Sequence, residues 1–265
     1  MEFSFSDSRW LTQEEVDSDA DLGDRNALGF HIPGMWDKIL DIKKCHLQAD
    51  PSNDIRNAIK KFGLDNNFEF FNTRNQTGLL RTVMIRNTSI GEVMVVIQFF
   101  QEEKEKREGL LNALGEAFPQ ITALMYVING KGNDTLYDQH IILFKGRDHI
   151  FEEMEGLKFK INAKSFYQTN SDQAYELYKI TRDFAGLTGN ETVYDLYTGT
   201  GTIAQFVSKK AKKVIGVELQ NGEIIRAKSV VSNADPAATY KLVGHENLSN
   251  KLLKALSRRG IIQQL

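Results

Sequence analysis

Residues 193–218 constrain the fold of this chain more than any other stretch of its sequence. A short apolar run, 193–196, is followed closely by the segment Thr-Gly-Thr-Gly at 198–201. Apolar residues then recur at helical spacing, and a second apolar run, 214–217, ends at Glu218. The pattern predicts a strand, a glycine-rich turn, a helix and a parallel strand. This is half of a nucleotide-binding α/β unit, whose ligand lies over the carboxyl ends of its strands.

The residues around this turn narrow the class of ligand. Gly199 and Gly201 let a ligand approach the backbone, and Glu218 follows Gly199 by 19 residues, near the usual distance for a carboxylate that binds ribose hydroxyls. The glycines also fit a dinucleotide pattern, but Asp195 at the mouth of the loop would repel a pyrophosphate. S-adenosylmethionine has no phosphate and carries cationic ammonium and sulfonium groups, so the pattern predicts this methyl donor. A dinucleotide site and a purely structural turn are the alternatives.

Composition and charge exclude several classes of protein. The 265 residues are enough for one large or two small domains, and a net charge of −2 gives no global basic field for nucleic acid, although a local groove can still be basic. The single cysteine, Cys45, excludes an internal disulfide and fits a reducing compartment. No apolar run reaches membrane-spanning length, and the segment after Met1 is not a signal peptide. We therefore expect a cytoplasmic protein with no membrane segment and no metal site.

The amino-terminal half has the alternation of short β-rich and helical segments that is typical of an α+β domain. Two β-rich segments around the turn 88–91 predict an antiparallel hairpin. The expected strands are 2–6, 79–86, 92–100, 124–129 and 141–144, and the expected helices are 52–62, 106–118 and 171–186. The expected fold class is α/β overall, with an α+β central domain followed by the first half of a Rossmann-like domain.

Several separate motifs carry a family resemblance. They are Phe-Tyr-Gln-Thr-Asn at 166–170, Asp-Leu-Tyr-Thr-Gly-Thr-Gly-Thr at 195–202, Val-Glu at 217–218, and upstream the segments 2–6, 28–31, 45–48 and 78–81. In this order they resemble the RNA uracil-5-methyltransferase family, which includes enzymes that make 5-methyluridine in 23S ribosomal RNA and in the T-loop of transfer RNA. The resemblance covers residues 1 to about 218. It implies S-adenosyl-L-methionine as the cofactor and RNA, ribosomal or transfer, as the partner.

The resemblance also implies which residues contact the methyl donor. Gln168 would lie near the methionine moiety, Tyr197 beside the adenosine, and Thr202 at the helix start, in place of an asparagine common in the family. A core position for Tyr197 and a plain helix cap for Thr202 are the simpler alternatives. Together with the glycine-loop pattern, the predicted cofactor-binding residues are Gln168, Asp195, Tyr197, Gly199, Gly201, Thr202 and Glu218.

The same family pattern predicts no catalytic residue in this chain. Family members attack C6 of uracil with a cysteine thiolate and then use a carboxylate base to remove the C5 proton. The motifs that carry both groups are missing after Glu218, and Cys45 is expected to be a small buried residue. The family's amino-terminal RNA-binding barrel is missing too. We therefore expect an incomplete chain that is inactive alone. A non-catalytic RNA-binding or non-functional fragment and a dinucleotide-binding oxidoreductase fragment are the alternatives.

The carboxyl-terminal segment departs from the family. Asn221-Gly222 predicts a tight hairpin, whereas a parallel sheet needs a crossover after Glu218. Residues 214–265 resemble part of a phytoene-desaturase-like flavin oxidoreductase, which suggests a chimeric chain; a genuine divergent tail is the alternative. The expected domains are a central α+β domain at 1–155, a partial S-adenosylmethionine-binding domain at 156–218 and a foreign or divergent tail at 219–265.

Three arginines of the central domain leave two interpretations open. Arg74, Arg81 and Arg86 lie in or near the predicted hairpin, where their side chains could contact RNA phosphates. Surface solubility explains the same residues equally well. The sequence alone does not decide between the two.

Overall fold

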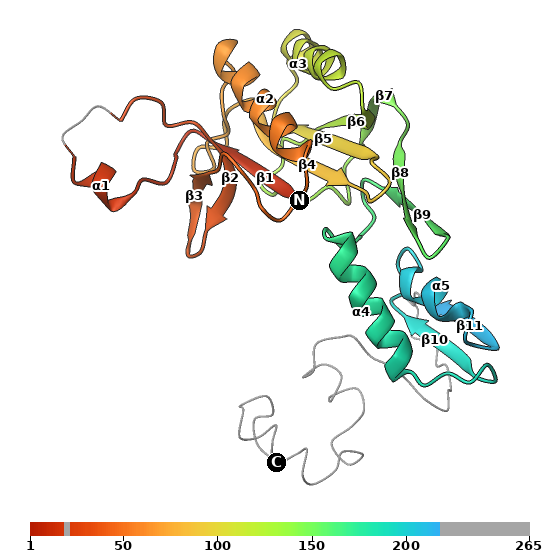
Figure 1. Cartoon of the computed structure of the whole chain (residues 1–265). Helices are drawn as coiled ribbons and strands as arrows, with labels where there is room; N and C mark the ends of the chain where they lie inside the picture. The colour runs from red at the N-terminus through yellow and green to blue at the C-terminus, as the bar shows by residue number, and fades with distance from the viewer. Residues whose placement is uncertain (19–21, 218–265) are drawn as a thin grey trace. The chain divides into compact units, whose positions relative to one another are not determined.

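The computed structural model describes residues 1–18 and 22–217 (Figure 1). It divides into two compact units, Met1–Thr181 and a unit that begins at Arg182. Glu218 and the expected Asn221-Gly222 turn lie outside the described residues. The domain boundaries expected from the sequence stay a prediction.

The first unit is built on a seven-stranded mixed sheet with the order β3-β2-β1-β4-β5-β6-β7. All neighbouring strands are antiparallel except β5 and β6, which are parallel and are linked by the helix α3. The strands are β1 (Glu2–Ser6), β2 (Ala27–Ile32), β3 (Met35–Asp41), β4 (Leu80–Asn87), β5 (Val93–Phe99), β6 (Ile121–Ile128) and β7 (Ile142–Gly146).

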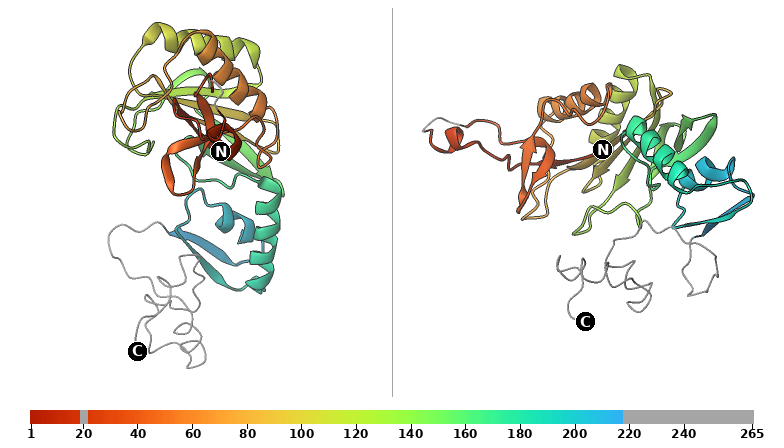
Figure 2. Two further views of the ribbon diagram at one scale, coloured as in Figure 1. Left: turned by 90° about the vertical axis from the view of Figure 1, so that its left-hand side faces the viewer. Right: turned by 60° about the horizontal axis from the view of Figure 1, so that its bottom comes forward.

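Alternating side chains of the sheet enter two apolar clusters on its two faces. On one face, Phe3, Val95 and Phe99 pack with residues of α2 (Ser52–Asp65) and α3 (Lys104–Ala117), which lie next to each other in Figures 1 and 2. On the other face, Met94 and Val96 pack with a separate hairpin, β8 (His149–Met154) and β9 (Leu157–Asn162). A short helix, α1 (Gln13–Val16), has no buried residue.

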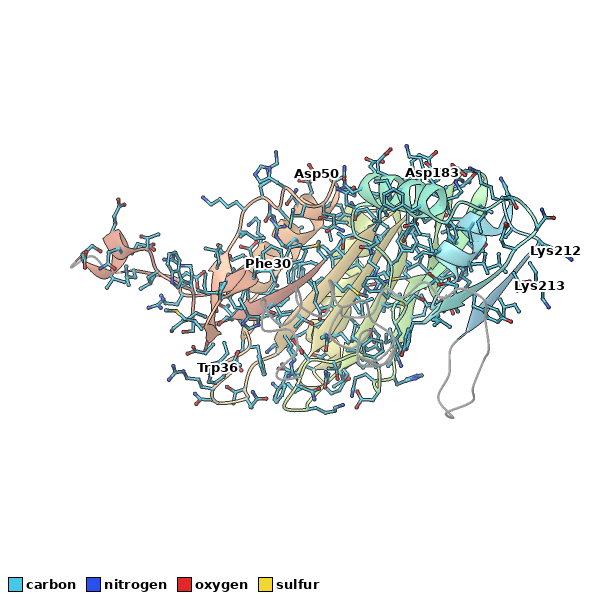
Figure 3. The ribbon with its side chains drawn as sticks, turned by 90° about the horizontal axis from the view of Figure 1, so that it is seen from below. Phe30, Trp36, Asp50, Asp183, Lys212 and Lys213 are labelled. Carbon is cyan, nitrogen blue, oxygen red and sulfur yellow. The ribbon has the colours of Figure 1, made fainter. Side chains whose placement is uncertain are left out.

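Most of the expected elements of this unit are confirmed. The strand 2–6, the antiparallel β4–β5 hairpin, both helices and the strands β6 and β7 are present within a few residues of their expected bounds. The sequence analysis missed the strands β2, β3, β8 and β9 and the short helix α1. The hairpin of β2 and β3 carries the exposed Trp36, which is labelled in Figure 3.

The second unit contains the strand, helix and strand predicted from the glycine-rich stretch. β10 (Thr192–Leu196) and β11 (Lys213–Val217) are parallel, and α5 (Thr202–Ser208) connects them and contacts both. Phe206 and Val207 are the buried apolar residues of this helix. Lys212 and Lys213, labelled in Figure 3, follow the helix, and Lys213 begins β11. The helix α4 (Ser171–Phe184), also predicted, contains the division between the two units.

Within the part of the chain that the structure describes, no helix is long and apolar enough to cross a membrane. The described residues also contain no group of three or more histidine, cysteine, aspartate or glutamate side chains arranged to hold a metal ion.

Candidate functional site

The loop between β10 and α5 adopts an unusual backbone conformation. Tyr197, Gly199 and Gly201 have φ angles of 60°, 50° and 73°, which lie in the left-handed region that favours glycine. The amide of Gly201 donates a hydrogen bond of 2.7 Å to the carbonyl of Thr198, which closes the turn. A Cβ atom added at Gly199 would meet no other atom within 4 Å. The loop therefore leaves space for a ligand beside Gly199, at the carboxyl end of β10.

Tyr197 lies on the outside of this loop. Its side chain is 70% exposed, so the alternative that it belongs to the core is wrong. A tyrosine in the left-handed region is uncommon and costs free energy, because its Cβ crowds the backbone there. An exposed aromatic ring in a strained turn is more typical of a residue that contacts a ligand than of one that packs in a core.

Asp195 holds the loop in place. Its Oδ2 accepts a hydrogen bond of 2.9 Å from the Thr198 hydroxyl and another of 3.0 Å from the backbone amide of Ala204 in α5. One carboxylate oxygen thus links β10, the loop and the first turn of the helix. Since Oδ2 already accepts two hydrogen bonds, a contact between Asp195 and the methyl donor S-adenosylmethionine would use the other carboxylate oxygen, Oδ1.

Two further residues, Gly216 and Thr202, constrain the conformation of the loop. Gly216 of β11 pairs with Asp195, and a Cβ atom at Gly216 would approach the Thr198 Oγ1 to 2.9 Å. Thr202 is buried, and its hydroxyl lies 2.8 Å from that of Thr200. The N-cap of α5 is Gly201, so the expectation that Thr202 caps this helix is wrong. Thr202 instead fixes the loop from within the first turn.

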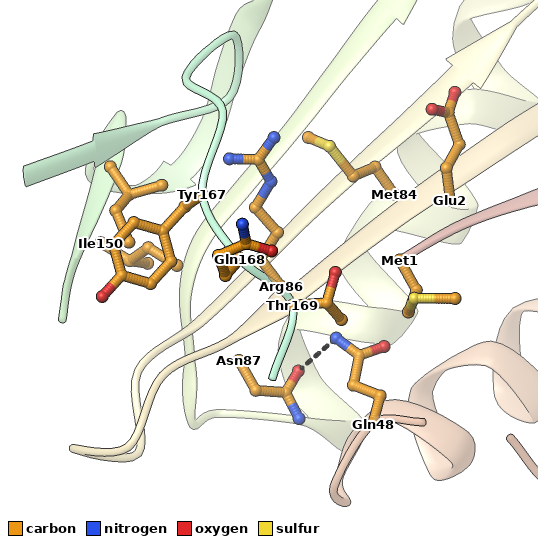
Figure 4. Close-up of a pocket in the computed structure, with 11 residues that line it drawn as sticks. Met1, Glu2, Gln48, Met84, Arg86, Asn87, Ile150, Tyr167, Gln168 and Thr169 are labelled. Carbon is orange, nitrogen blue, oxygen red and sulfur yellow. Dashed lines mark hydrogen bonds between the residues drawn. The ribbon is translucent and has the colours of Figure 1, made fainter. Parts of the chain in front are cut away.

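Gln168 belongs to the first unit, whereas the other described candidate residues belong to the second. It lies in the segment between β9 and α4 and lines a cavity of about 160 Å³ whose walls include Tyr167, Thr169 and Arg86 (Figure 4). The structure describes each unit by itself, so the prediction that Gln168 and the loop contact one donor molecule stays a prediction. Glu218 lies outside the described residues.

The sequence analysis did not find Glu152, a fully buried carboxylate on β8. Glu152 accepts hydrogen bonds from the Ser89 amide at 3.1 Å, from the Ser89 hydroxyl and from the Ser171 hydroxyl at 2.5 Å. Ser171 begins α4, three residues after Gln168, so Glu152 ties the segment that carries Gln168 to the turn between β4 and β5. The only sign of this buried carboxylate in the sequence was a charged residue at an inward-facing position of a segment in which apolar and polar residues alternate.

Two of the three arginines singled out from the sequence, Arg81 and Arg74, differ in their contacts. The Arg81 side chain is buried, donates hydrogen bonds of 2.7 Å to the carbonyls of Asn129 and Lys131, and stacks on Phe71. Arg81 is therefore part of the core and is not positioned for RNA. Arg74 is exposed and pairs with Asp37 through a bond of 2.5 Å.

Cys45, the only cysteine of the chain, is buried, as expected. Its backbone amide donates a 2.7 Å hydrogen bond to the side chain of Asn53. The residue has a packing role in the apolar cluster beside α2.

Comparison of the sequence with known proteins shows the family of the chain. No protein-family model matches the chain. The chain is 52% identical over 269 aligned residues to an uncharacterized RNA methyltransferase of Porphyromonas gingivalis, a match that covers 99% of the chain and 58% of the relative. It is 55% identical over 221 residues to an uncharacterized RNA methyltransferase of Bacteroides thetaiotaomicron, covering 82% of the chain and 49% of that relative. The chain belongs to the family of these RNA methyltransferases. It spans about half the length of the curated relatives that it matches.

A solved structure shares the fold. The crystal structure of the tRNA (uracil-54, C5)-methyltransferase of Pyrococcus abyssi, in complex with S-adenosyl-L-homocysteine, matches with a TM-score of 0.58 and 22% identity, over 81% of this chain and 47% of that one. This likeness confirms the expected fold class, an α/β architecture with a Rossmann-like methyltransferase segment. At this identity it shows the fold alone.

The comparisons give no support to a chimeric chain. The match to the Porphyromonas gingivalis relative covers 99% of the chain and so includes nearly all of residues 219–265. A genuine tail, the alternative interpretation of this segment, agrees with that coverage.

Proposed function

We propose that this chain carries the S-adenosylmethionine-binding loop of an RNA methyltransferase that acts on C5 of uracil. The observation that carries the proposal is the left-handed loop at residues 197–201, which the Asp195 carboxylate holds open at the carboxyl end of β10. The family of the chain supports RNA as the substrate. Uracil C5 is supported by the motifs at 166–170 and 195–202 and by the name of the Pyrococcus abyssi enzyme that shares the fold.

The described residues fit this donor. There is space for a ligand beside the Cα of Gly199, and the exposed ring of Tyr197 can lie against an adenine. Strand pairing places the ends of β10 and β11 side by side, with Leu196 opposite Val217, so the chain leaves β11 next to the loop. Glu218 is the next residue in the sequence and lies outside the described residues, and its role as the carboxylate that binds the ribose hydroxyls stays a prediction. When bound, S-adenosylmethionine would supply an electrophilic methyl group.

The chain offers no nucleophile for attack on uracil. Its only cysteine, Cys45, is buried among apolar residues of the first unit, which shield its thiol from a substrate. We therefore propose that the chain by itself binds the donor without methylating RNA. The matched relatives are about twice as long as this chain, and we propose that the complete activity needs a chain of that length.

Isothermal titration with S-adenosylhomocysteine tests the donor site. Replacing Asp195 by alanine removes two hydrogen bonds to a charged acceptor, worth roughly 1.5–3 kcal/mol each, so we expect binding weaker by about tenfold or more. Glu176→Gln is the matched control, because Glu176 is exposed on α4 and pairs with Lys179. Equal affinity of the Asp195→Ala variant and the unaltered chain would contradict the proposal.

The same titration separates the alternatives. A dinucleotide-binding fragment would bind NADH, and its affinity would not depend on Asp195. A fragment that only binds RNA would bind neither ligand. A cytoplasmic location stays a prediction.

A further inference from the structure

The charge of the chain is divided unevenly along its sequence. Residues 1–181, which form the first unit, contain 21 lysines and arginines against 28 aspartates and glutamates. The described part of the second unit, residues 182–217, contains five basic residues against three acidic ones. Four of these five are lysines within the segment 209–213, which we call the lysine segment. The positive charge of the second unit is therefore concentrated in one short stretch.

The lysine segment joins α5 to β11 and carries the exposed residues Lys209, Lys210, Lys212 and Lys213. Lys213 pairs with Thr192 at the amino ends of the parallel strands β10 and β11, and Figure 3 shows Lys212 and Lys213 at this end. The donor loop follows β10 at the carboxyl end, which is roughly 13 Å away at the usual rise of a strand. The donor site therefore does not explain the lysine segment.

Local stability explains only part of the lysine segment. Lys209 is the C-cap of α5 and Lys210 follows it, where a positive charge interacts favourably with the helix dipole. Lys212 and Lys213 lie beyond the end of this helix. Their backbone amides donate hydrogen bonds to the carbonyl of Glu191, which fixes the start of β11. The fold of the described unit thus uses the backbone of these two lysines and leaves their side chains in solvent.

The three carboxylates of the described second unit do not neutralise the lysine segment. Those of Glu191 and Asp195 accept hydrogen bonds from the turn before β10 and from the donor loop. Asp183 lies 3.8 Å from the Lys210 Nζ, and an exposed pair at this distance contributes little. No ion pair joins the side chains of residues 212–213 to another described residue. The segment therefore presents uncompensated positive charge.

A phosphate backbone fits this surface better than a lipid membrane does. Closely spaced lysines bind successive phosphates, and each contact releases a counterion, which gives affinity independent of sequence. A stable contact between a short segment and an anionic membrane combines lysines with exposed apolar or aromatic side chains that enter the lipid. Between residues 198 and 216, no large apolar side chain is exposed. The chemistry of the segment therefore favours a nucleic acid.

We infer that the lysine segment binds phosphates of the RNA substrate at a distance from the methyl-donor loop. This inference rests on the proposed function, because it takes RNA as the substrate. The segment and the donor loop lie at opposite ends of β10 and β11, so the phosphates belong to nucleotides other than the one that receives the methyl group. The contact carries no sequence information. It adds electrostatic affinity to a chain whose first unit has an excess of acidic residues.

Fluorescence anisotropy with the full 265-residue chain tests the inference, with fluorescein-labelled dodecauridylate and dodecacytidylate as probes. The variant Lys212→Gln/Lys213→Gln should bind both probes about tenfold more weakly at low salt, because it loses two phosphate contacts. The slope of log affinity against log salt concentration should decrease in magnitude by about 1.4, since each contact with a single strand contributes about 0.7. An unchanged slope, or no binding of either probe by the unaltered chain, would overturn the inference.

Two further double variants separate the effect of charge from effects of folding and position. Lys212→Arg/Lys213→Arg keeps both charges and should keep the affinity and the slope of the unaltered chain. Lys60→Gln/Lys61→Gln removes two adjacent lysines of α2 that already pair with Asp41 and Asp65, so the slope should not change. If this control lowers the slope as much as the variant at 212 and 213, RNA binds without preference for the lysine segment and the inference fails.

A titration with S-adenosylhomocysteine separates this inference from the proposed function. Donor binding that depends on Asp195 should persist in Lys212→Gln/Lys213→Gln, because the donor loop lies at the other end of the strands. If donor binding is intact while the salt slope is unchanged, only the phosphate surface is refuted. If the unaltered chain binds neither the donor nor RNA, the proposed function fails as well.

Sedimentation with phosphatidylglycerol vesicles tests the membrane as the other source of phosphate groups. We expect the unaltered chain to remain in the supernatant, because the lysine segment has no exposed large apolar neighbour among the described residues. Vesicle binding that is lost in Lys212→Gln/Lys213→Gln, together with an unchanged salt slope for RNA, would assign the segment to a lipid surface and overturn the inference.

Discussion

Each of the two units of the molecule is stabilised by a different kind of internal contact. In the first unit, every residue of β5 is buried, and apolar clusters cover both faces of the seven-stranded sheet. In the second unit, no residue of β10 is fully buried, and α5 alone contributes fully buried apolar residues among those described. Parallel strands are usually covered on both faces, and a pair of strands is only marginally stable by itself. The glycine loop therefore depends on polar contacts of Asp195 and Thr198 more than on a core.

Truncation of a core residue should show the largest difference between the units. Phe99→Ala removes a fully buried ring from β5 and should lower the free energy of unfolding by about 3–5 kcal/mol. Ile215→Ala in β11 removes a side chain that is only half-buried, so its cost should be less than half of that. Urea unfolding followed by circular dichroism measures both. Similar losses in the two variants would show that the second unit has a core comparable to the first.

Substitution of Glu152, which is buried in the first unit, tests whether polar side-chain contacts stabilise only the second unit. Glu152→Gln replaces one carboxylate oxygen by an NH₂ group that faces donors on Ser89 and Ser171, and should cost roughly 1–3 kcal/mol. Glu153→Gln is the matched control, because Glu153 is the exposed neighbour on the same strand. Hydrogen exchange at the start of α4 should accelerate in the first variant alone. Unchanged exchange would mean that Ser171 is held by other contacts.

The elements that the sequence predicted are those with a strong local pattern. β10, α5 and β11 were predicted because apolar runs flank two glycines, and β4 and β5 because two β-rich segments flank a short polar turn. The missed strand β8 is joined to β9 by Glu155 and Gly156, both with positive φ. Glutamate is an unusual residue for the first position of such a turn, where asparagine or aspartate is preferred, so the hairpin carried no recognisable signal.

The candidate site was predictable as a set of residues, but its internal contacts were not. The sequence identified Asp195 and the two glycines from their spacing. It could not show that Asp195 bonds the Ala204 amide, because a helix N-terminus offers several amides at similar spacing. It also gave no sign of the positive φ at Tyr197, which the hydrogen bonds of the loop impose on a residue that disfavours it.

Crowding at Gly216 tests how tightly the loop is fitted to β11. Gly216→Ala places a Cβ 2.9 Å from Thr198 Oγ1 and 3.0 Å from its methyl group, so Thr198 must move away from Asp195. We expect a loss of about 1 kcal/mol and faster hydrogen exchange at the Ala204 amide. In a Thr198→Ala background only the Cβ of residue 198 remains close, at 3.2 Å, so the same substitution should cost much less. Additive losses would show that Gly216 acts independently of the loop.

The smallest expected effect concerns the turn that leads into β10. Hydrogen bonds from the hydroxyl and amide of Thr188 lower the pKa of Glu191 to about 2. Because this pKa is lower in the folded state, the carboxylate stabilises the turn fully above its ordinary value of 4.5, and the contribution is lost as the pH falls towards 2. The carboxyl ¹³C shift of Glu191 should titrate with a midpoint near 2, and Thr188→Val should move that midpoint towards 4.5.

The backbone carbonyl of Glu191 also accepts hydrogen bonds from the amides of Lys212 and Lys213, so the turn joins both strands of the second unit. A midpoint already near 4.5 in the unaltered chain would mean that the Thr188 contacts are not needed to hold these strands. The second unit would then depend less on polar contacts than its incompletely buried strands suggest.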